Sequence, residues 1–307
     1  MDFRIFIEPQ QGTTYDRILA LATHAERLGF NGFFTSDHYL KMGASDGLPG
    51  PTDAWTTLAG LARDTSNIRL GTLVSPVTFR HLGSLAISVA QIDQMSEGRV
   101  ELGLGAGWYE EEHKAQGLPF PDIATRFDLL EESLEVLNAI WNLEKGEFFN
   151  YQGKRVQFEN SMGLPKPKQE PGPPIIMGGI GQRRTPNLVA KYASEYNTPF
   201  VSPDTFASLV GVVKDKCVEL GRNPKDLIYS CAQVFCCGDE ETIFSKRALT
   251  IGREVGELRV NGLAGTPDEV IRRAEEFKQN GCDRLYLQIL DDCDLEHLDL
   301  AAEIFLN

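Results

Sequence analysis

Short apolar runs alternate with helical segments along the whole chain, and this alternation constrains the fold more than any other feature. The runs at residues 3–9, 31–38, 68–74, 99–105, 173–179, 195–199, 226–236 and 283–290 have the length and composition of buried strands. Segments with apolar residues three or four positions apart follow them, at 14–29, 52–65, 82–98, 125–142, 184–194, 203–220, within 239–255, at 267–280 and at 297–305. Strands that alternate with helices indicate parallel βαβ units. Eight such units in 307 residues predict an α/β fold, a single (β/α)8 TIM barrel domain over residues 1–307.

Two segments are longer than the connections that such a barrel needs. One follows the fourth predicted strand, at 106–124, and the other spans 143–172 and carries aromatic residues, glycines and prolines. A linker between domains would be more polar and less aromatic. We therefore expect insertions within one domain, with residues 143–172 forming a hairpin over the mouth of the barrel.

The charge of the chain limits its partners. It has 44 acidic and 30 basic residues, a formal net charge of −14. This balance argues against nucleic acid or an anionic membrane as the main partner, because both attract a basic surface. No apolar run approaches the roughly 20 residues of a membrane span, and the first residues lack the pattern of a signal peptide. We therefore expect a cytoplasmic protein that acts on a small-molecule substrate.

The cysteines and histidines do not indicate a metal site. None of the six cysteines forms a C-x-x-C pair, so buried free thiols are expected. Glu110 and His113 have the E-x-x-H spacing of a metal-binding helix. A di-metal site needs two such motifs and the chain has one. We interpret this segment as a solvated start of a helix and expect no bound metal.

The residues that end the predicted strands are candidates for the active site, because a barrel of this kind builds its site at the carboxyl ends of its strands. The second strand ends in Ser36, Asp37 and His38. A histidine changes its charge near neutral pH and can accept or donate a proton while a hydride moves. His38 is the candidate acid–base residue, unless it only bonds the backbone at the strand end. Asp37 either orients His38 or caps a turn.

The stretch GRVELGLGAGWYEEEH, residues 98–113, places glycines at 103, 105 and 107. A dinucleotide-binding loop would open the first βα unit and pass directly into a helix. This stretch follows the fourth predicted strand, and further residues precede the next helix. We therefore expect the glycines to end a strand at the catalytic face and to let a flat group approach the backbone.

A second glycine-rich stretch, MGGIGQRR at residues 177–184, runs into a helix. Free backbone N–H groups at the start of a helix bind anions. Arg183 and Arg184 add positive charge. This stretch is the better candidate for a phosphate site, although barrels more often bind phosphate after the seventh and eighth strands.

Together these motifs resemble the bacterial luciferase-like flavin and deazaflavin oxidoreductases, a superfamily of (β/α)8 barrels. The resemblance covers nearly the whole chain and rests on GFFTSDHY, IRLGTLVSPVTFRH, GRVELGLGAGWYEEEH with GLPFP, RFDLLEESLEVLNAIW and PPIIMGGIGQRRTPNLVAKYASEYN. One branch of this family uses reduced FMN and molecular oxygen. The other uses the deazaflavin coenzyme F-420 (F420) and transfers hydride only. A Ser-Asp-His sequence after the second strand is similar to the F420 branch.

The resemblance implies a role for individual residues. His38 would lie beside the reactive ring as a catalytic residue, with Asp37 next to it. The bend at 73–75 looks like a bulge where a non-prolyl cis peptide often supports the ring. The implied cofactor-binding residues are Ser36, Leu73, Val74, Ser75, Gly105, Gly107, Gly178, Gly179, Ile180 and Gly181.

The resemblance also implies a substrate pocket lined by Trp108 and Tyr109. Trp108 departs from the pattern, because sugar-phosphate-oxidising members carry a carboxylate proton donor at this position. Indole cannot take that role, so the sequence argues against a sugar phosphate and predicts an apolar end to the pocket. The alternative is that both aromatic residues pack on the outside.

Three functions remain open from the sequence. The first is hydride transfer between F420 and a small organic substrate. The second is an FMN-dependent monooxygenase that uses reduced flavin and oxygen, and oxygen consumption separates it from the first. The third is a flavin-binding barrel without catalysis, in which substitution of His38 has no effect. The resemblance further implies a homodimer.

Overall fold

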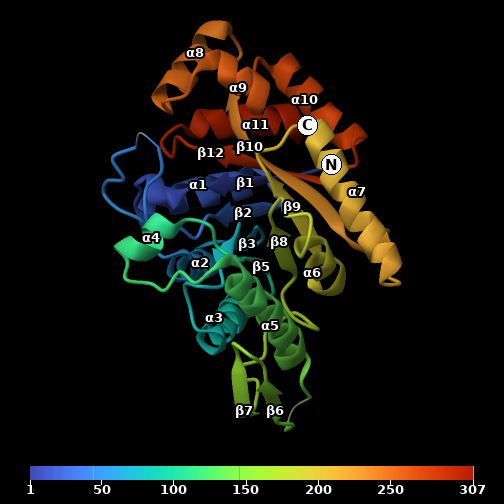
Figure 1. The fold of residues 1–307 in the computed structure, drawn as a ribbon. Coiled ribbons are helices and arrows are strands. Elements are labelled where there is room, and N and C mark those ends of the chain that lie inside the picture. Colours follow the sequence, from blue (N-terminus) through green and yellow to red (C-terminus); the bar gives the residue numbers. More distant parts are fainter. Residues whose placement is uncertain (44, 145, 307) are drawn as a thin grey trace.

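The computed structural model describes residues 1–43, 45–144 and 146–306 of the chain. Within these residues, eight parallel strands close into a barrel in which each pairs with the next and the last pairs with the first (Figure 1). The strands are β1 (Asp2–Ile7), β2 (Gly32–Thr35), β3 (Arg69–Thr72), β5 (Val100–Gly105), β8 (Ile175–Gly178), β9 (Glu195–Pro199), β10 (Ile228–Cys237) and β12 (Arg284–Ile289). The predicted (β/α)8 barrel is confirmed.

Helices cover the outside of this barrel. They are α1 (Tyr15–Leu28), α2 (Ala54–Asp64), α3 (Leu82–Met95), α5 (Ile123–Asn142), α6 (Thr185–Tyr192), α7 (Pro203–Glu219), α10 (Pro267–Gln279) and α11 (Leu295–Phe305). Shorter elements join them: η1 (Pro9–Gln11), β4 (Ser75–Pro76), α4 (Glu110–Ala115) and η2 (Pro224–Asp226). No helix in the described part of the chain is both long and apolar enough to cross a membrane.

Local signals set where the helices begin and end. The Thr14 side chain caps α1 by accepting a hydrogen bond from the Arg17 N–H, and Gly29 ends the helix in a left-handed conformation. Thr266 and Glu269 form a capping box at the start of α10. These signals explain why α1 and α10 lie within two residues of their predicted bounds.

The segment after β10 differs from the prediction. Helices were expected within 239–255, but α8 (Glu241–Thr250) stops early and α9 (Val255–Asn261) extends past that range. Gly252 takes a left-handed φ of 67° directly after α8, which breaks the helix there. A further strand, β11 (Leu263–Gly265), then pairs with the end of β10 and lies outside the barrel path.

Two layers of side chains fill the amino end of the barrel. In the outermost layer, Arg4 of β1 bonds Glu101 of β5 at 2.8 Å, and Arg284 of β12 pairs with Glu195 of β9. Side chains two positions further along a strand face the same side. They form an apolar layer above the ion pairs, made of Phe6, Phe34, Leu73, Ile176, Ala232 and Tyr286. Both layers are buried, so the open end of the described barrel is the carboxyl end.

The insertion at 143–172 contains an antiparallel hairpin, β6 (Phe149–Gln152) and β7 (Gln157–Ser161). Its turn is held by Glu132 of α5, which accepts hydrogen bonds from three successive N–H groups at 154–156, each at 2.8 Å. The Tyr151 hydroxyl donates to Glu135 of the same helix at 2.8 Å. Figure 1 shows the hairpin beside α5 and α3, at the opposite end of the view from α8. These contacts place the hairpin against α5, and residues 155–158 line one cavity with residues 77–82, which follow β4. The position over the mouth stays a prediction.

Candidate functional site

His38 is fixed at the mouth of the barrel by a residue from a distant part of the chain. The strand β2 ends at Thr35, and His38 follows three residues later. Its Nδ1 lies 2.9 and 3.0 Å from the two carboxylate oxygens of Glu112 on α4. Glu112 is buried and also accepts a hydrogen bond from the Tyr39 N–H at 3.1 Å. The carboxylate therefore holds both the ring and the backbone of this loop.

This contact decides which ring nitrogen of His38 is available. A carboxylate only accepts hydrogen bonds, so the Nδ1 of His38 carries the proton in the neutral ring. The lone pair then lies on Nε2, which forms no hydrogen bond with any described residue. A histidine in this state can accept a proton from a substrate, and Glu112 stabilises the imidazolium that results.

Asp37 does not orient His38 through a hydrogen bond in the described structure. Its buried carboxylate accepts a hydrogen bond from the Ser75 hydroxyl at 2.5 Å and forms a bidentate ion pair with Arg80 at 2.6 and 3.1 Å. The Trp55 indole N–H donates to the same Ser75 hydroxyl at 3.0 Å. Asp37 thus ties the end of β2 to β4 and lies behind the site.

Arg80 joins this network to a second carboxylate. It pairs with Asp53 and donates to the Tyr39 hydroxyl at 2.7 Å. Burial opposes ionisation of Asp53, but hydrogen bonds from Tyr39 and a backbone N–H, with the charge of Arg80, lower its pKa to about 2. Burial and the neighbouring carboxylates raise the pKa of Tyr39 above its usual range. The two loops that carry Tyr39 and Arg80 are therefore locked together.

Val74 forms an apolar surface over the glycines of two neighbouring strands. The peptide bond between Leu73 and Val74 is cis, as expected at this bend. A Cβ built on Gly103 or Gly105 would lie 2.9 or 3.0 Å from the Val74 methyl groups, and one on Gly178 would lie 3.4 Å away. The glycines leave room for the half-buried Val74 side chain, which lies across the ends of β5 and β8. The sequence predicted that Gly103 and Gly105 admit a flat group and that Gly178 helps to hold a phosphate, but not that a side chain of the protein packs against these glycines.

The remaining predicted residues lie around this surface. The Ser36 hydroxyl donates to the buried Gln10 amide oxygen at 2.5 Å, which joins the ends of β2 and β1. Gly107 has a left-handed φ of 79°, so the turn after β5 requires glycine. Trp108 and Tyr109 follow, with rings stacked 5.2 Å apart.

The aromatic pair stands next to His38. The rings of Trp108 and His38 are 5.7 Å apart and meet edge to face, and the Tyr109 ring is 6.2 Å from His38. Trp108 is 66% exposed, which places it at the rim, while the Tyr109 hydroxyl donates to the Lys41 carbonyl at 3.0 Å. Both residues therefore border the mouth at the place where His38 lies.

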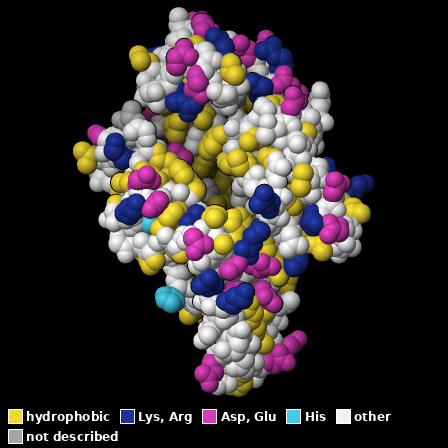
Figure 2. Space-filling view, viewed as in Figure 1, with side chains coloured by type: hydrophobic (Ala, Val, Ile, Leu, Met, Phe, Trp, Pro, Cys, Tyr) yellow, Lys and Arg dark blue, Asp and Glu magenta, His cyan; other side chains and the backbone are white. Residues whose placement is uncertain are grey.

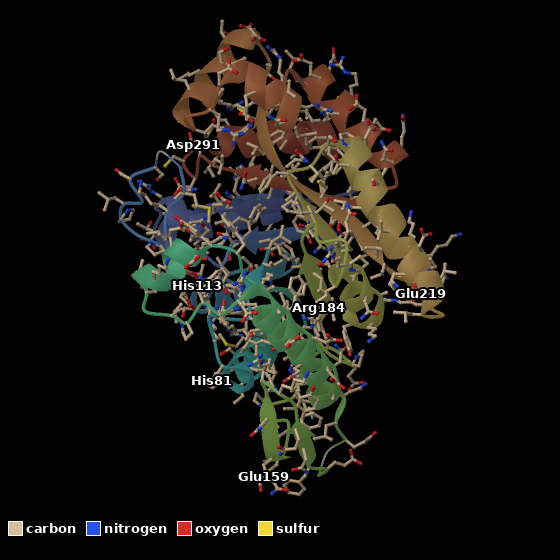
Figure 3. All side chains as sticks on the ribbon, in the orientation of Figure 1. His81, His113, Glu159, Arg184, Glu219 and Asp291 are labelled. Atoms are coloured by element: carbon tan, nitrogen blue, oxygen red, sulfur yellow. The ribbon has the colours of Figure 1, made fainter. Side chains whose placement is uncertain are left out.

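The loop at 178–181 connects β8 to α6. Its backbone is anchored at Gly179, whose N–H donates to the Asn197 carbonyl at 3.1 Å, while Ile180 and Gly181 are exposed. Figure 3 labels Arg184 beside α5. Arg184 does not offer a free charge here, because it pairs with Asp128 and Glu131 of α5 at 2.7 and 2.9 Å. The exposed backbone of the loop remains available to an anion.

His113 and Glu110 do not act together. His113 is fully buried on α4, where its Nδ1 contacts the Tyr109 carbonyl at 2.7 Å and its Nε2 the Thr78 hydroxyl at 2.6 Å. Glu110 is exposed and pairs with Lys114. His113 therefore anchors the loop that carries Trp108. The first two residues of α4, Glu110 and Glu111, are exposed as predicted, whereas Glu112 and His113 are buried.

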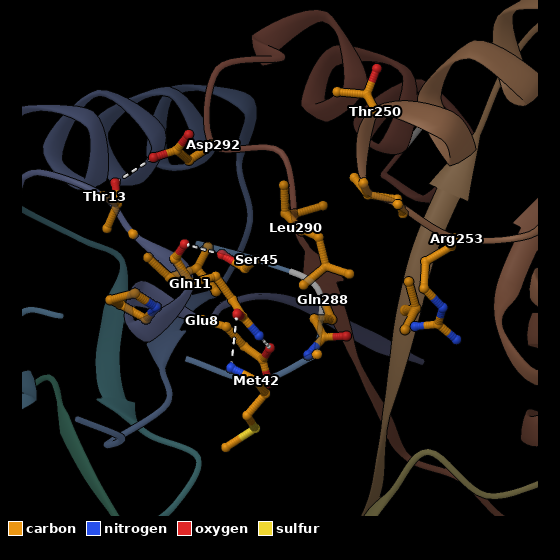
Figure 4. Close-up of a pocket in the computed structure, with 18 of the residues that line it drawn as sticks. Glu8, Gln11, Thr13, Met42, Ser45, Thr250, Arg253, Gln288, Leu290 and Asp292 are labelled. Atoms are coloured by element: carbon orange, nitrogen blue, oxygen red, sulfur yellow. Dashed lines mark hydrogen bonds between the residues drawn. The ribbon is translucent and has the colours of Figure 1, made fainter. Parts of the chain in front are cut away.

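A cavity of about 930 Å³ opens at the carboxyl ends of β1, β10 and β12 (Figure 4). Figure 2 shows a hollow near the centre of the molecule that is bordered by apolar side chains. The cavity wall includes Glu8 and Gln11 after β1, Gln288 of β12, and Arg253 between α8 and α9. None of the residues that the sequence predicted for the site is among these lining residues. The predicted cofactor surface occupies the half of the mouth formed by β2, β3, β5 and β8.

Sequence reasoning missed two features of the mouth. Glu112 was visible as an acid four residues after Trp108, but nothing in its spacing linked it to His38. Glu8 directly follows the first strand, a position at the catalytic face that the same rule for strand ends would have selected.

The profile of the family described as luciferase-like monooxygenase matches residues 1–252 of the chain. An F420-dependent glucose-6-phosphate dehydrogenase of Microbacterium testaceum is 31% identical over 215 residues, which cover 69% of this chain and 61% of that protein. Pyrimidine monooxygenase RutA of Stutzerimonas stutzeri is 29% identical over 245 residues, 76% of this chain and 63% of that protein. The matches span between 45% and 66% of the length of such curated relatives.

The fold is also found among solved structures. An F420-dependent secondary alcohol dehydrogenase in complex with an F420-acetone adduct superposes with a TM-score of 0.85, over 99% of this chain and 98% of that one. At 19% sequence identity this likeness shows the shared barrel and no more. Because the family profile covers most of a barrel with this topology, the chain belongs to the luciferase-like monooxygenase family, which includes F420-dependent dehydrogenases and flavin-dependent monooxygenases.

Proposed function

We propose that this protein is an F420-dependent oxidoreductase that transfers hydride between the coenzyme and a small organic substrate. The observation that carries the proposal is the His38–Glu112 pair, with Nδ1 bonded at 2.9 Å and Nε2 without a partner among the described residues. Oxidation of an alcohol removes a hydride from carbon and a proton from oxygen. A histidine with an available Nε2 provides the base for that proton.

The residues at the mouth fit a flat ring with a phosphate-bearing tail. Val74, lying over Gly105 and Gly178, presents an apolar surface without protruding polar groups. A ring packed on this surface would lie between β3 and β8, near the loop of His38. The exposed backbone at 180–181 precedes α6, where free N–H groups suit a phosphate. The predicted cofactor residues that would hold this ring and tail lie at the ends of β2, β3, β5 and β8.

The chain itself would supply position and proton transfer. When bound, a deazaflavin supplies a carbon that accepts or donates a hydride. His38 Nε2 would take the substrate hydroxyl proton, and the buried Glu112 carboxylate would stabilise the positive ring. Trp108 and Tyr109 border the site with indole and phenol rings, which would cover one side of a bound substrate. The Trp108 indole does not act as an acid near neutral pH, so His38 would carry the proton in both substrate oxidation and substrate reduction.

A second candidate is an FMN-dependent monooxygenase. The apolar surface at Val74 suits an isoalloxazine ring as well as a deazaflavin, and relatives include a flavin-dependent trigonelline monooxygenase of Acinetobacter baylyi. The Ser36-Asp37-His38 sequence favours the F420 branch, because the FMN branch tends to carry other residues there. We therefore rank this function second.

Turnover with each cofactor tests the proposal. Oxidised F420 is mixed anaerobically with a panel of unphosphorylated alcohols, and its visible absorbance is followed. In parallel, reduced FMN is supplied by a flavin reductase and oxygen uptake is recorded. We expect F420 reduction that falls at least about 100-fold in His38→Gln, with unchanged F420 affinity. Oxygen uptake coupled to a product with FMN, and no turnover with F420, would contradict the proposal.

A further inference from the structure

The cavity at the ends of β1, β10 and β12 has an unusual balance of charge. Apolar side chains such as Met42, Phe200 and Leu290 form much of its wall (Figure 4). Its described ionisable residues are four acids and one base: Glu8, Asp46, Glu257, Asp292 and Arg253. Such a wall disfavours an anion, because removal of an anion from water needs compensation by positive charge.

The single basic residue of this wall is already occupied. The Arg253 guanidinium bonds Glu257 with Nε at 3.0 Å and with Nη2 at 2.6 and 2.8 Å. This bidentate geometry is the one in which a guanidinium binds carboxylate or phosphate. A phosphorylated ligand would have to displace Glu257 before it could use Arg253.

Two acids of the cavity, Glu8 and Asp46, form no ion pair with a described residue, and Glu8 is the less exposed of the two. Its carboxylate accepts one long hydrogen bond, from the Gln11 side chain at 3.3 Å, and no described Lys, Arg or His nitrogen lies within 4.0 Å of it. Asp292, by comparison, accepts a hydrogen bond from the Thr13 hydroxyl, and its Oδ1 lies 3.7 Å from Nη1 of Arg17. An ionisable group of this kind in a cavity is a candidate for a functional residue.

The surroundings of Glu8 connect the cavity to the site of His38. Burial raises the pKa of the Glu8 carboxyl, and the charges of His38 and Arg253 oppose that rise only in part. The Ser36 N–H, two residues before His38, donates to the Ile7 carbonyl next to Glu8 at 3.0 Å. Glu8 therefore directly follows the strand that neighbours the strand leading to the proposed base.

We propose that this cavity is the substrate pocket, that it takes an unphosphorylated alcohol or amine, and that Glu8 accepts a hydrogen bond from a hydroxyl or ammonium group of that substrate. This inference deepens the proposed function and rests on it, because it names the substrate class of the same barrel mouth. The apolar wall would hold the carbon skeleton. Phosphorylated substrates would be excluded, because Glu257 holds the cavity's one guanidinium.

Three probes that differ only in their polar group test the proposal: cyclohexylamine, cyclohexanol and cyclohexyl phosphate. Their binding to the purified full chain is measured by ligand-observed NMR titration, with and without saturating F420. We expect the amine and the alcohol to bind and the phosphate not to bind. Glu8→Gln should weaken cyclohexylamine at least about tenfold, because a hydrogen bond to a charged group is lost.

Two further variants serve as controls for the loss of a charge and for misfolding. Glu303→Gln removes an equal charge from the exposed face of α11, outside the cavity, and should leave all three affinities unchanged. Glu257→Gln frees Arg253 and should give cyclohexyl phosphate measurable binding. The second variant tests the account of phosphate exclusion even if Glu8→Gln does not fold, which far-UV circular dichroism would show.

The outcomes separate this inference from the proposed function. The inference would be overturned if the natural chain bound cyclohexyl phosphate as tightly as cyclohexylamine, or bound none of the three probes. An unchanged cyclohexylamine affinity in Glu8→Gln would also overturn it. A chain that binds the amine through Glu8 but neither F420 nor FMN would contradict the proposed function instead. F420 affinity should be the same in Glu8→Gln as in the natural chain, because Glu8 lies outside the proposed ring surface.

Discussion

The contact between Val74 and Gly105 offers a direct test of the proposed ring surface. In Gly105→Ala, the new methyl carbon would lie 3.0 Å from Val74 Cγ2, closer than an ordinary van der Waals contact of 3.4 to 4 Å. Gly105 has an ordinary strand conformation, so the substitution brings no backbone strain. Val74 must therefore move by a few tenths of an ångström, away from β5 and toward the surface on which the ring would lie.

The magnitude follows from two opposing effects. Overpacking of a well-packed site costs about 1–3 kcal/mol. Replacing glycine reduces the freedom of the unfolded chain and returns roughly 0.4–1 kcal/mol. We expect a net loss of about 1–2 kcal/mol in the free energy of unfolding, and a loss of F420 affinity of about tenfold. For a chain of 307 residues, 1 kcal/mol corresponds to on the order of 1.5 °C in Tm.

A double-mutant cycle isolates this contact. Val74→Ala removes the methyl group that the side chain introduced by Gly105→Ala would meet, so the double variant should be less destabilised than the sum of the two single variants by about 1 kcal/mol or more. Urea denaturation followed by circular dichroism gives the stabilities, and fluorescence titration gives F420 affinities. Additivity within about 0.4 kcal/mol would refute the contact. An F420 affinity that Gly105→Ala leaves unchanged would refute the ring surface.

Further predictions concern packing, pH and catalysis. Gly103→Ala should lower the free energy of unfolding by more than about 3 kcal/mol or prevent folding, because its Cβ would lie 2.0 Å from a carbonyl oxygen of β3. Gly211→Ala is the matched control: its Cβ meets open space in α7, so the same urea assay should show no change or a gain of about 0.5–1 kcal/mol. Burial, aided by a nearby arginine, lowers the pKa of His297 to about 3, so folding is favoured while this ring stays neutral. Because the unfolded histidine takes up a proton below about pH 6.5, the free energy of unfolding should fall as pH drops from 6.5 toward 3, by about 2 kcal/mol from this group at pH 5. If His297→Gln lost stability with falling pH as steeply as the natural chain, this prediction would be contradicted. Glu112→Gln should reduce kcat roughly tenfold or more and shift the pH–rate profile, while F420 binding stays the same. An unaltered pH–rate profile would refute the claim that Glu112 stabilises the protonated His38 ring.

The barrel could be predicted because its signals are local. Strand runs, helical spacing and caps such as Thr14 and Gly29 each act within a few residues, and the closed sheet follows from their alternation. The hairpin at 149–161 was foreseen as an insertion. Its position on α5 was not, because it depends on Glu132, whose capping of the hairpin turn leaves no mark in a helical pattern.

The candidate site divides in the same way. His38, Val74 and the glycines could be proposed because they sit at strand ends, where the rule for barrels points. The partner of His38 was missed, and Asp37 was the natural candidate as its neighbour in sequence. In the structure Asp37 bonds Ser75, and Glu112 reaches His38 across 74 residues. Such contacts depend on how loops fold back over the mouth, which periodicity and spacing do not encode.

The most direct test of the central claim is a comparison of cofactor affinities. Oxidised F420 and FMN are titrated separately into the purified protein, and the quenching of their fluorescence is followed. We predict tight F420 binding, with FMN at least about tenfold weaker, a difference of about 1.4 kcal/mol. Tighter binding of FMN than of F420 would contradict the account and place the monooxygenase first, and binding of neither would contradict both.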